Sequence, residues 1–343
     1  MLKTIRHILE MISFSHTLFA LPFAMLAAVM AWHTYPTPIG THDLLPGAAP
    51  TADSSATPTS LDDFPRFGPG LEADFDLFTD SSFKIQHVLS LLLCMAAARS
   101  FAMSINRLAD RKLDSQNPRT AGRHLPAGIL NVGQVAAFAA ACAIVFVVST
   151  LLFLPNWLPL ALSVPVLAFL AGYSYAKRFT WLAHAWLGAA LGLSPVAAWI
   201  AIRGDVVLIY PADLLPAIIL GAAVLTWVAG FDIIYACQDY DIDRKAGLHS
   251  VPVKFGVPGA LRIAAACHLL TIALLACLPL VYPPFGWIYW SGVAAVAVLL
   301  VYEHLLVRPD DLSRLNAAFF NVNAVISLGL FAVGTLDLLM GHG

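Results

Sequence analysis

The residues best suited to chemistry lie in two short polar segments, and the first of these begins at Asn106. Asn106, Asp110 and Asp114 follow one another at intervals of four residues. On a helix, this spacing places three oxygen-bearing side chains along one face. Arg99 precedes Asn106 by seven residues, so it lies on the same face about two turns deeper, within an apolar stretch. An arginine in such a place is costly, which indicates that it has a function.

The second polar segment repeats this pattern 129 residues later. Asp239 and Asp243 are again four residues apart, and Asp232 precedes Asp239 by seven, which predicts that all three share one helical face. Asp241 falls on a different face of an ideal helix. Tyr235 lies between the first two aspartates of the segment.

Carboxylates that lie this close together repel one another unless a cation compensates their charge. Clusters of hard oxygen ligands suit Mg²⁺, which keeps several waters and bridges to phosphate. Either segment alone could equally be the solvated end of a membrane helix. Two such clusters, separated by four apolar segments, instead predict the two halves of one metal site.

Basic residues accompany both segments and complete a possible anion site. They are Arg119 and Arg123 after the first segment, Lys177 and Arg178 between the two, and Lys245 after the second. Together with Mg²⁺ they would form a clamp for a diphosphate, because metal and guanidinium both neutralise its charge. The chain has no glycine-rich phosphate loop, so the anion is not expected to be held in a nucleotide fold.

The composition shows what kind of scaffold must position these residues. Of the 343 residues, 59% are hydrophobic and only 12% are charged, about half the share of a soluble domain. This excludes a soluble enzyme, a disordered regulator and a secreted disulfide scaffold, and it predicts a polytopic membrane protein. The net charge of −2 gives no reason to expect a nucleic-acid partner. No pair of the five cysteines has metal or redox spacing.

Apolar stretches long enough to cross a bilayer predict an all-α fold of about nine transmembrane helices in a single domain spanning residues 1–343. The first stretch resembles a signal peptide, but Pro22 interrupts it and no small-residue cleavage site follows, so we expect a retained helix. The expected spans lie at about residues 12–32, 84–106, 131–154, 157–176, 180–202, 211–236, 257–280, 287–307 and 316–339.

Lysine and arginine gather in alternate connections, namely those after the second, fourth, sixth and eighth spans. The positive-inside rule therefore predicts that the N-terminus and both aspartate segments face the cytoplasm and that the C-terminus lies outside. For a bacterial-type protein this membrane is the inner one. The outer connection at 33–83 is long, acidic and rich in Pro, Ser, Thr and Gly, so we expect a flexible insertion, with a partly ordered lid as the alternative.

Several stretches besides the aspartate segments carry a family resemblance. They are residues 15–24, 98–100, 117–120, 173–180, 232–239 and 247–256. Together with the repeated Asp-x3-Asp pattern they resemble the UbiA superfamily of intramembrane aromatic prenyltransferases, in particular its 4-hydroxybenzoate polyprenyltransferase branch. The resemblance extends over nearly all of the chain from residue 12 onward, except for 33–83, where the family has a short loop.

This resemblance implies nine helices around a central cavity and a Mg²⁺-dependent transfer of a polyprenyl group from an isoprenyl diphosphate to an aromatic hydroxy acid. It implies Mg²⁺ ligands at Asn106, Asp110, Asp114, Asp239 and Asp243. It implies diphosphate binding by Lys177, Arg178, Arg119, Arg123 and Lys245. Asp232 would orient or deprotonate the aromatic acceptor, while Arg99 and Tyr235 would contact either the acceptor or the diphosphate.

The first choice of acceptor is 4-hydroxybenzoate, a ubiquinone precursor. Residues 227–239 also resemble relatives that act in futalosine-route menaquinone synthesis, whose acceptor would be 1,4-dihydroxy-6-naphthoate. Relatives that prenylate haem or chlorophyll share the aspartates but fit the other signatures less well. A transporter is the alternative from another class, although its usual midplane charges are limited here to Arg99. A structural role without catalysis would be favoured only if one aspartate segment were missing.

Overall fold

The structure is a computed structural model and describes residues 6–8, 10–11, 17–34, 83–307 and 315–341. Most of the expected insertion at 33–83 therefore lies outside the described residues. Within them every regular element is helical, which confirms the all-α prediction. The main helices are α2 (Thr17–His33), α4 (Ile85–Gln116), α5 (Val132–Thr150), α6 (Leu158–Tyr173), α7 (Ala183–Ile209), α8 (Leu215–Ala236), α9 (Tyr240–Lys245), α10 (Val251–Val281), α11 (Trp287–Leu306) and α12 (Leu315–Met340).

Each of the nine expected apolar segments corresponds to one long helix among the described residues. Seven helices are long and apolar enough to cross a membrane, and α2 and α6 contain shorter apolar helices at Phe19–His33 and Leu158–Tyr173. The chain is therefore an integral membrane protein. α4 extends ten residues beyond its predicted end at 106, because the polar residues that follow the apolar stretch continue the same helix.

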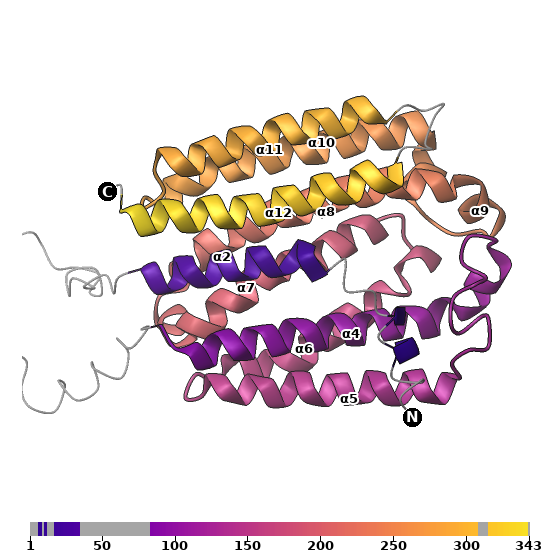
Figure 1. The fold of residues 1–343 in the computed structure, drawn as a ribbon, viewed down its shortest axis with the longest axis horizontal. Helices are drawn as coiled ribbons and strands as arrows, with labels where there is room; N and C mark the ends of the chain where they lie inside the picture. Colours follow the sequence, from indigo (N-terminus) through magenta and orange to yellow (C-terminus); the bar gives the residue numbers. More distant parts are fainter. Residues whose placement is uncertain (1–5, 9, 12–16, 35–82, 308–314, 342–343) are drawn as a thin grey trace, which may run out of the picture.

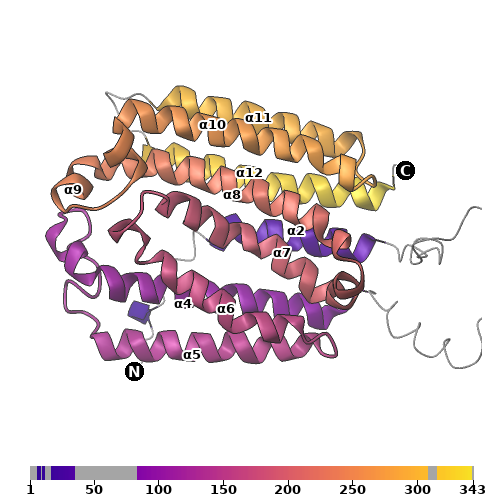
Figure 2. The same ribbon diagram turned by 180° about the vertical axis from the view of Figure 1, so that it is seen from behind.

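The long helices lie side by side along one direction (Figure 1). α4, α5 and α6 form one side of the bundle, and α8, α10, α11 and α12 form the other, as the view from behind also shows (Figure 2). α2 and α7 lie between these groups, where α2 packs on α7 and α12, and α7 packs on α8. α9 lies at one end of the bundle, and α12 ends at the opposite end.

The centre of the bundle is built around Trp227 of α8, whose side chain is fully buried. Its ring packs against Phe19 and Phe23 of α2 and against Phe231 of its own helix. The indole N–H donates to the side-chain oxygen of Asn323 in α12 over 2.9 Å. An unpaired N–H would be costly inside an apolar bundle, so this bond ties α8 to α12 in a defined register.

Glycines allow α7 and α8 to approach each other closely. A Cβ on Gly221 would lie only 2.6 Å from the carbonyl oxygen of Gly192, and a Cβ on Gly188 would collide with the carbonyl of Leu225. Small residues at such crossings let two membrane helices pack backbone to backbone. This contact sets the position of α8 and therefore that of the aspartates at its end.

A buried ion pair closes the end of the bundle at which α7 ends. The Arg203 side chain, 2% exposed, donates to both carboxylate oxygens of Asp213, at 2.7 Å and 2.9 Å. Trp199 donates to the same carboxylate over 2.9 Å, and Arg203 also donates to the backbone oxygen of Thr34 over 3.2 Å. These bonds join α2, α7 and the 3₁₀ turn Pro211–Leu214.

We expect Asp213→Ala to lower the free energy of unfolding by about 3 kcal/mol, because it leaves a buried guanidinium without its counter-charge. Thermal unfolding of the detergent-solubilised protein would measure the loss as a lower Tm. Asp205→Ala in α7, the helix that carries Arg203, is the control, since Asp205 takes no part in these bonds. An unchanged Tm for Asp213→Ala would contradict this account of the network.

Candidate functional site

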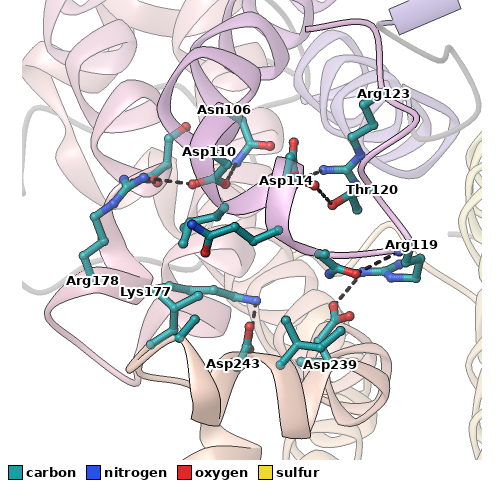
Figure 3. Close-up of a pocket in the computed structure, with 18 of the residues that line it drawn as sticks. Asn106, Asp110, Asp114, Arg119, Thr120, Arg123, Lys177, Arg178, Asp239 and Asp243 are labelled. Atoms are coloured by element: carbon teal, nitrogen blue, oxygen red, sulfur yellow. Dashed lines mark hydrogen bonds and ion pairs between the residues drawn. The ribbon is translucent and has the colours of Figure 1, made fainter. Parts of the chain in front are cut away.

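A cavity of about 610 Å³ opens at the end of the bundle near α9, and both aspartate segments line it (Figure 3). The structure thus brings together residues that lie more than a hundred positions apart in the chain. The predicted site residues that line the cavity are Asn106, Asp110, Asp114, Arg119, Arg123, Lys177, Arg178, Asp232, Tyr235, Asp239, Asp243 and Lys245.

The C-terminal part of α4 forms one wall of the cavity. Because α4 remains helical to Gln116, the four-residue spacing places Asn106, Asp110 and Asp114 on one face, as predicted. Asn106 donates a hydrogen bond from its side-chain amide to Asp110 over 3.1 Å. Asp114 is buried, and the Thr120 hydroxyl donates to its backbone oxygen over 3.1 Å, which folds the following loop back over the helix end.

The second wall differs from the prediction in its backbone. We predicted that Asp232, Asp239 and Asp243 share the face of one helix, but α8 ends at Ala236 and a 3₁₀ turn, Cys237–Asp239, precedes α9. All three aspartates still line the cavity, although the 3₁₀ turn changes the rotation of Asp239 and Asp243 relative to Asp232. Asp241 is exposed and is absent from the cavity wall, in line with its predicted face.

The basic side chains connect the two walls by ion pairs. Arg178 reaches Asp110 at 3.1 Å, and Arg123 reaches Asp114 at 2.7 Å. On the opposite wall, Arg119 reaches Asp239 at 2.6 Å, and Lys177 lies 3.5 Å from Asp243. Four aspartates therefore each face one cation of the predicted diphosphate clamp, as Figure 3 shows.

Two of these cations hold further contacts that place them at the junction of several elements. Arg119 also donates to the hydroxyl of Tyr235 over 2.9 Å and lies over its ring. Arg178 donates to the backbone oxygen of Ala109 in α4 over 2.8 Å.

Burial opposes the charge of the Lys177 ammonium, but the surrounding carboxylates, above all Asp243, outweigh it and raise the pKa of this lysine. Lys177 therefore remains cationic at neutral pH.

The donor set fits a hard divalent cation. One carboxylate oxygen each of Asp114 and Asp239 is buried and accepts no hydrogen bond from the described residues. Buried carboxylate oxygens without partners are costly, and a cation together with its waters would satisfy them. Carboxylate and amide oxygens are ligands that Mg²⁺ prefers.

One predicted residue does not reach the cavity. Arg99 is absent from the cavity wall and lies deeper in α4, where its Nε is buried and has no hydrogen-bond partner among the described residues. Tyr173 lies close enough to interact electrostatically with Arg99, and Tyr173 itself lines the cavity. Arg99 therefore lies outside the cavity wall, beside one of the residues that form it. Lys245 does line the cavity and is exposed.

Sequence reasoning missed His184, which is buried at the start of α7. Its Nδ1 lies 2.6 Å from a carboxylate oxygen of Asp232. The sequence also gave no reason to single out Thr120, whose hydroxyl fixes the loop after α4. A histidine within a predicted apolar span was the available signal for His184, but only the folded chain shows that it faces an aspartate 48 positions away.

Another group of possible metal ligands lies apart from the cavity wall. His7, Glu10 and His124 hold their ligand atoms within 4.8 Å of one another. The Glu10 carboxylate is also paired with Arg6 at 2.8 Å. Imidazole nitrogens suit Zn²⁺ better than Mg²⁺, so this group does not extend the aspartate site.

Comparison with known proteins gives a consistent result. Residues 77–325 match the UbiA prenyltransferase family. A 4-hydroxybenzoate octaprenyltransferase of Burkholderia mallei is 34% identical over 226 residues, which cover 66% of this chain and 75% of that protein. The enzyme of the same name from Methylococcus capsulatus is 33% identical over 243 residues, covering 68% and 77%.

Solved structures show the same architecture. The apo structure of a UbiA homolog from Aeropyrum pernix K1 superposes with a TM-score of 0.71 at 27% identity, covering 94% of this chain and 97% of that one. A UbiA homolog from Archaeoglobus fulgidus, bound to DMAPP and Mg²⁺, has a TM-score of 0.60 at 17% identity, covering 97% and 99%. The second likeness concerns the fold alone.

Proposed function

This chain belongs to the UbiA prenyltransferase family, and from that premise we propose that it transfers a polyprenyl group from an isoprenyl diphosphate to 4-hydroxybenzoate in quinone synthesis. The observation that carries the proposal is the pair of aspartate walls that face each other across one cavity, with four cations between them. The names of the two 4-hydroxybenzoate octaprenyltransferases support the choice of acceptor.

The aspartate walls would hold Mg²⁺ through Asn106, Asp110, Asp114, Asp239 and Asp243. Bound Mg²⁺ would neutralise charge on the diphosphate as it leaves. The partnerless carboxylate oxygens of this site support the assignment. So does the Archaeoglobus fulgidus homolog, which was solved with DMAPP and Mg²⁺.

When substrate binds, four cations would exchange their ion pairs with the aspartates for contacts with the diphosphate, namely Lys177, Arg178, Arg119 and Arg123. Lys245 would approach the diphosphate from the rim of the cavity. These cations stabilise the negative charge that develops as the C–O bond breaks. The apolar bundle would accommodate the isoprenyl chain and keep water from the allylic cation. Asp232 would act on the aromatic acceptor, and Tyr235 would contact the acceptor or the diphosphate.

Of the two roles predicted for Arg99, we propose that it binds the aromatic acceptor. It lies deeper in α4 than the aspartates, and its buried Nε has no hydrogen-bond partner in the described part of the chain. A guanidinium pairs well with a carboxylate, and the proposed acceptor carries one.

We further propose that the cavity faces the cytoplasm across a bacterial-type inner membrane and that the C-terminus lies outside. The basic residues gather around the cavity, as the positive-inside rule requires of a cytoplasmic face. α12 ends at the opposite end of the bundle, which is compatible with an external C-terminus.

The proposal is tested by incubating the purified protein with Mg²⁺ and a long-chain isoprenyl diphosphate and detecting product by mass. 4-Hydroxybenzoate and 1,4-dihydroxy-6-naphthoate are supplied in parallel. We expect prenylated 4-hydroxybenzoate. Product from the naphthoate alone would reassign the chain to menaquinone synthesis. Product from neither acceptor would contradict aromatic prenyl transfer to these acids.

We expect Arg178→Ala to reduce kcat/KM for the isoprenyl diphosphate by about 100-fold, because it removes one charged donor from the leaving group. Steady-state kinetics at saturating acceptor would measure the change. Arg111→Ala is the matched control, since Arg111 is exposed and absent from the cavity wall. Equal kcat/KM values for the two variants would exclude Arg178 from the clamp.

A further inference from the structure

We propose that His184 is a positioning residue that holds Asp232 in place as the base for the aromatic acceptor. The inference rests on the proposed function and assigns a division of labour among the aspartates of the cavity. Asp110, Asp114, Asp239 and Asp243 serve the metal and diphosphate, whereas Asp232 serves the acceptor.

The ion-pair partners of the aspartates distinguish Asp232 from the other four. The first four face an arginine or a lysine of the clamp, at 2.6–3.5 Å. Asp232 instead pairs with His184, whose Nδ1 lies 2.6 Å from its Oδ2. The Asp232 side chain is 22% exposed and lines the cavity, while the His184 side chain is only 1% exposed and lies behind it. One end of the pair is therefore open to substrate and the other is enclosed.

The chemistry of the pair determines which tautomer His184 adopts. An ionised carboxylate can only accept hydrogen bonds, so Nδ1 must carry the proton that it donates to Asp232. The opposite ring nitrogen, Nε2, is buried and has no hydrogen-bond partner among the described residues. Within the described part of the chain, Nε2 therefore has no neighbour to which His184 could pass a proton. It can orient Asp232 but cannot act as a relay.

The backbone explains why the histidine is held firmly. His184 lies in the first turn of α7 and Asp232 near the end of α8, and the two helices approach through Gly188. A side chain at that position would push α8 away from α7. The glycine contact therefore fixes the separation across which the hydrogen bond forms, which is a preorganised geometry for a base.

In the proposed step, the acceptor ring gains the isoprenyl group and loses one proton. A ring carbon of the acceptor bonds to C1 of the isoprenyl group as the C1–O bond breaks, and the electron pair leaves with the diphosphate. The ring then loses the hydrogen of that carbon as a proton, and the C–H electrons restore its aromaticity. Asp232 accepts the proton on the oxygen that does not face His184. The neutral carboxyl group later releases it to water at the cavity mouth.

Two substitutions of equal polarity separate positioning from packing. His184→Asn places an amide N–H near the original Nδ1, whereas His184→Gln places it near Nε2, away from Asp232. We expect His184→Gln to lower kcat for prenylation by about 100-fold, the effect of a misplaced group. We expect His184→Asn to retain most of the activity. The KM for the isoprenyl diphosphate should stay at the wild-type value in both variants, because the clamp is untouched.

A double-mutant cycle with Asp232→Asn tests whether both residues act as a unit. Asp232→Asn alone should lower kcat by about 100-fold or more, and adding His184→Gln should cause little further loss. His87→Asn, a change of another buried histidine, is the control and should leave kcat unchanged. Size-exclusion profiles and Tm values would confirm that each variant is folded.

Several results would overturn the inference. Wild-type kcat in His184→Gln would do so, as would equal losses in His184→Asn and His184→Gln, which indicate packing alone. Additive losses in the double variant would also contradict it. Absence of product from the wild-type protein with both acceptors would instead overturn the proposed function, and the inference with it.

Discussion

Replacing either Asp110 or Asp239 with alanine is expected to lower product formation roughly 1,000-fold while leaving the protein folded. The two residues lie on opposite walls of the cavity, one on α4 and the other in the turn after α8. A metal site assembled from both walls loses its geometry when either carboxylate is removed. The same loss leaves Arg178 or Arg119 without its resting partner.

Steady-state turnover at saturating Mg²⁺ and both substrates would measure this effect. Asp241→Ala is a matched control, because Asp241 belongs to the second segment but is exposed and absent from the cavity wall. Near-normal turnover of one variant would restrict the metal site to the other wall. With folding confirmed by Tm, that result alone would refute a metal site shared by both walls, as would near-normal turnover of both variants.

Removing divalent cations is expected to abolish transfer completely, and adding Mg²⁺ back should restore it. The cavity wall carries five aspartates and five basic residues. A doubly or triply charged diphosphate would therefore leave the site with an excess of negative charge that the basic side chains alone do not offset. Exhaustive chelation followed by titration with Mg²⁺ would measure the requirement as product formed against free cation.

A readout independent of turnover strengthens this test. Isothermal titration would compare isoprenyl diphosphate binding with and without Mg²⁺, and we expect at least about 10-fold tighter binding with the cation. Asp114→Asn should weaken that coupling, because its buried oxygen is one of those without a partner. Transfer that continues after exhaustive chelation would contradict the magnesium assignment.

The sequence by itself determined the class of protein and the helices. Hydropathy is a local property, and about twenty consecutive apolar residues suffice to mark a span whatever its neighbours are. The register of Asn106, Asp110 and Asp114 was equally accessible, because helical periodicity depends only on spacing. Local spacing was less reliable for Asp232, Asp239 and Asp243, since nothing in it signals the 3₁₀ turn at Cys237–Asp239.

Only the tertiary structure decided which charges meet. The sequence predicted a set of bases and a set of acids, but it did not pair Arg119 with Asp239 or Arg123 with Asp114. It predicted that Arg99 lies deeper in the same helix than Asn106, but it did not show that this arginine falls outside the cavity wall.

The contact between His184 and Asp232 shows why the sequence alone does not predict such pairs. It depends on how closely α7 and α8 cross, and that separation is set by Gly188 and Gly192 of α7 and Gly221 of α8. Contacts of this kind arise from packing between elements distant in sequence. Composition and periodicity describe one helix at a time and do not contain them.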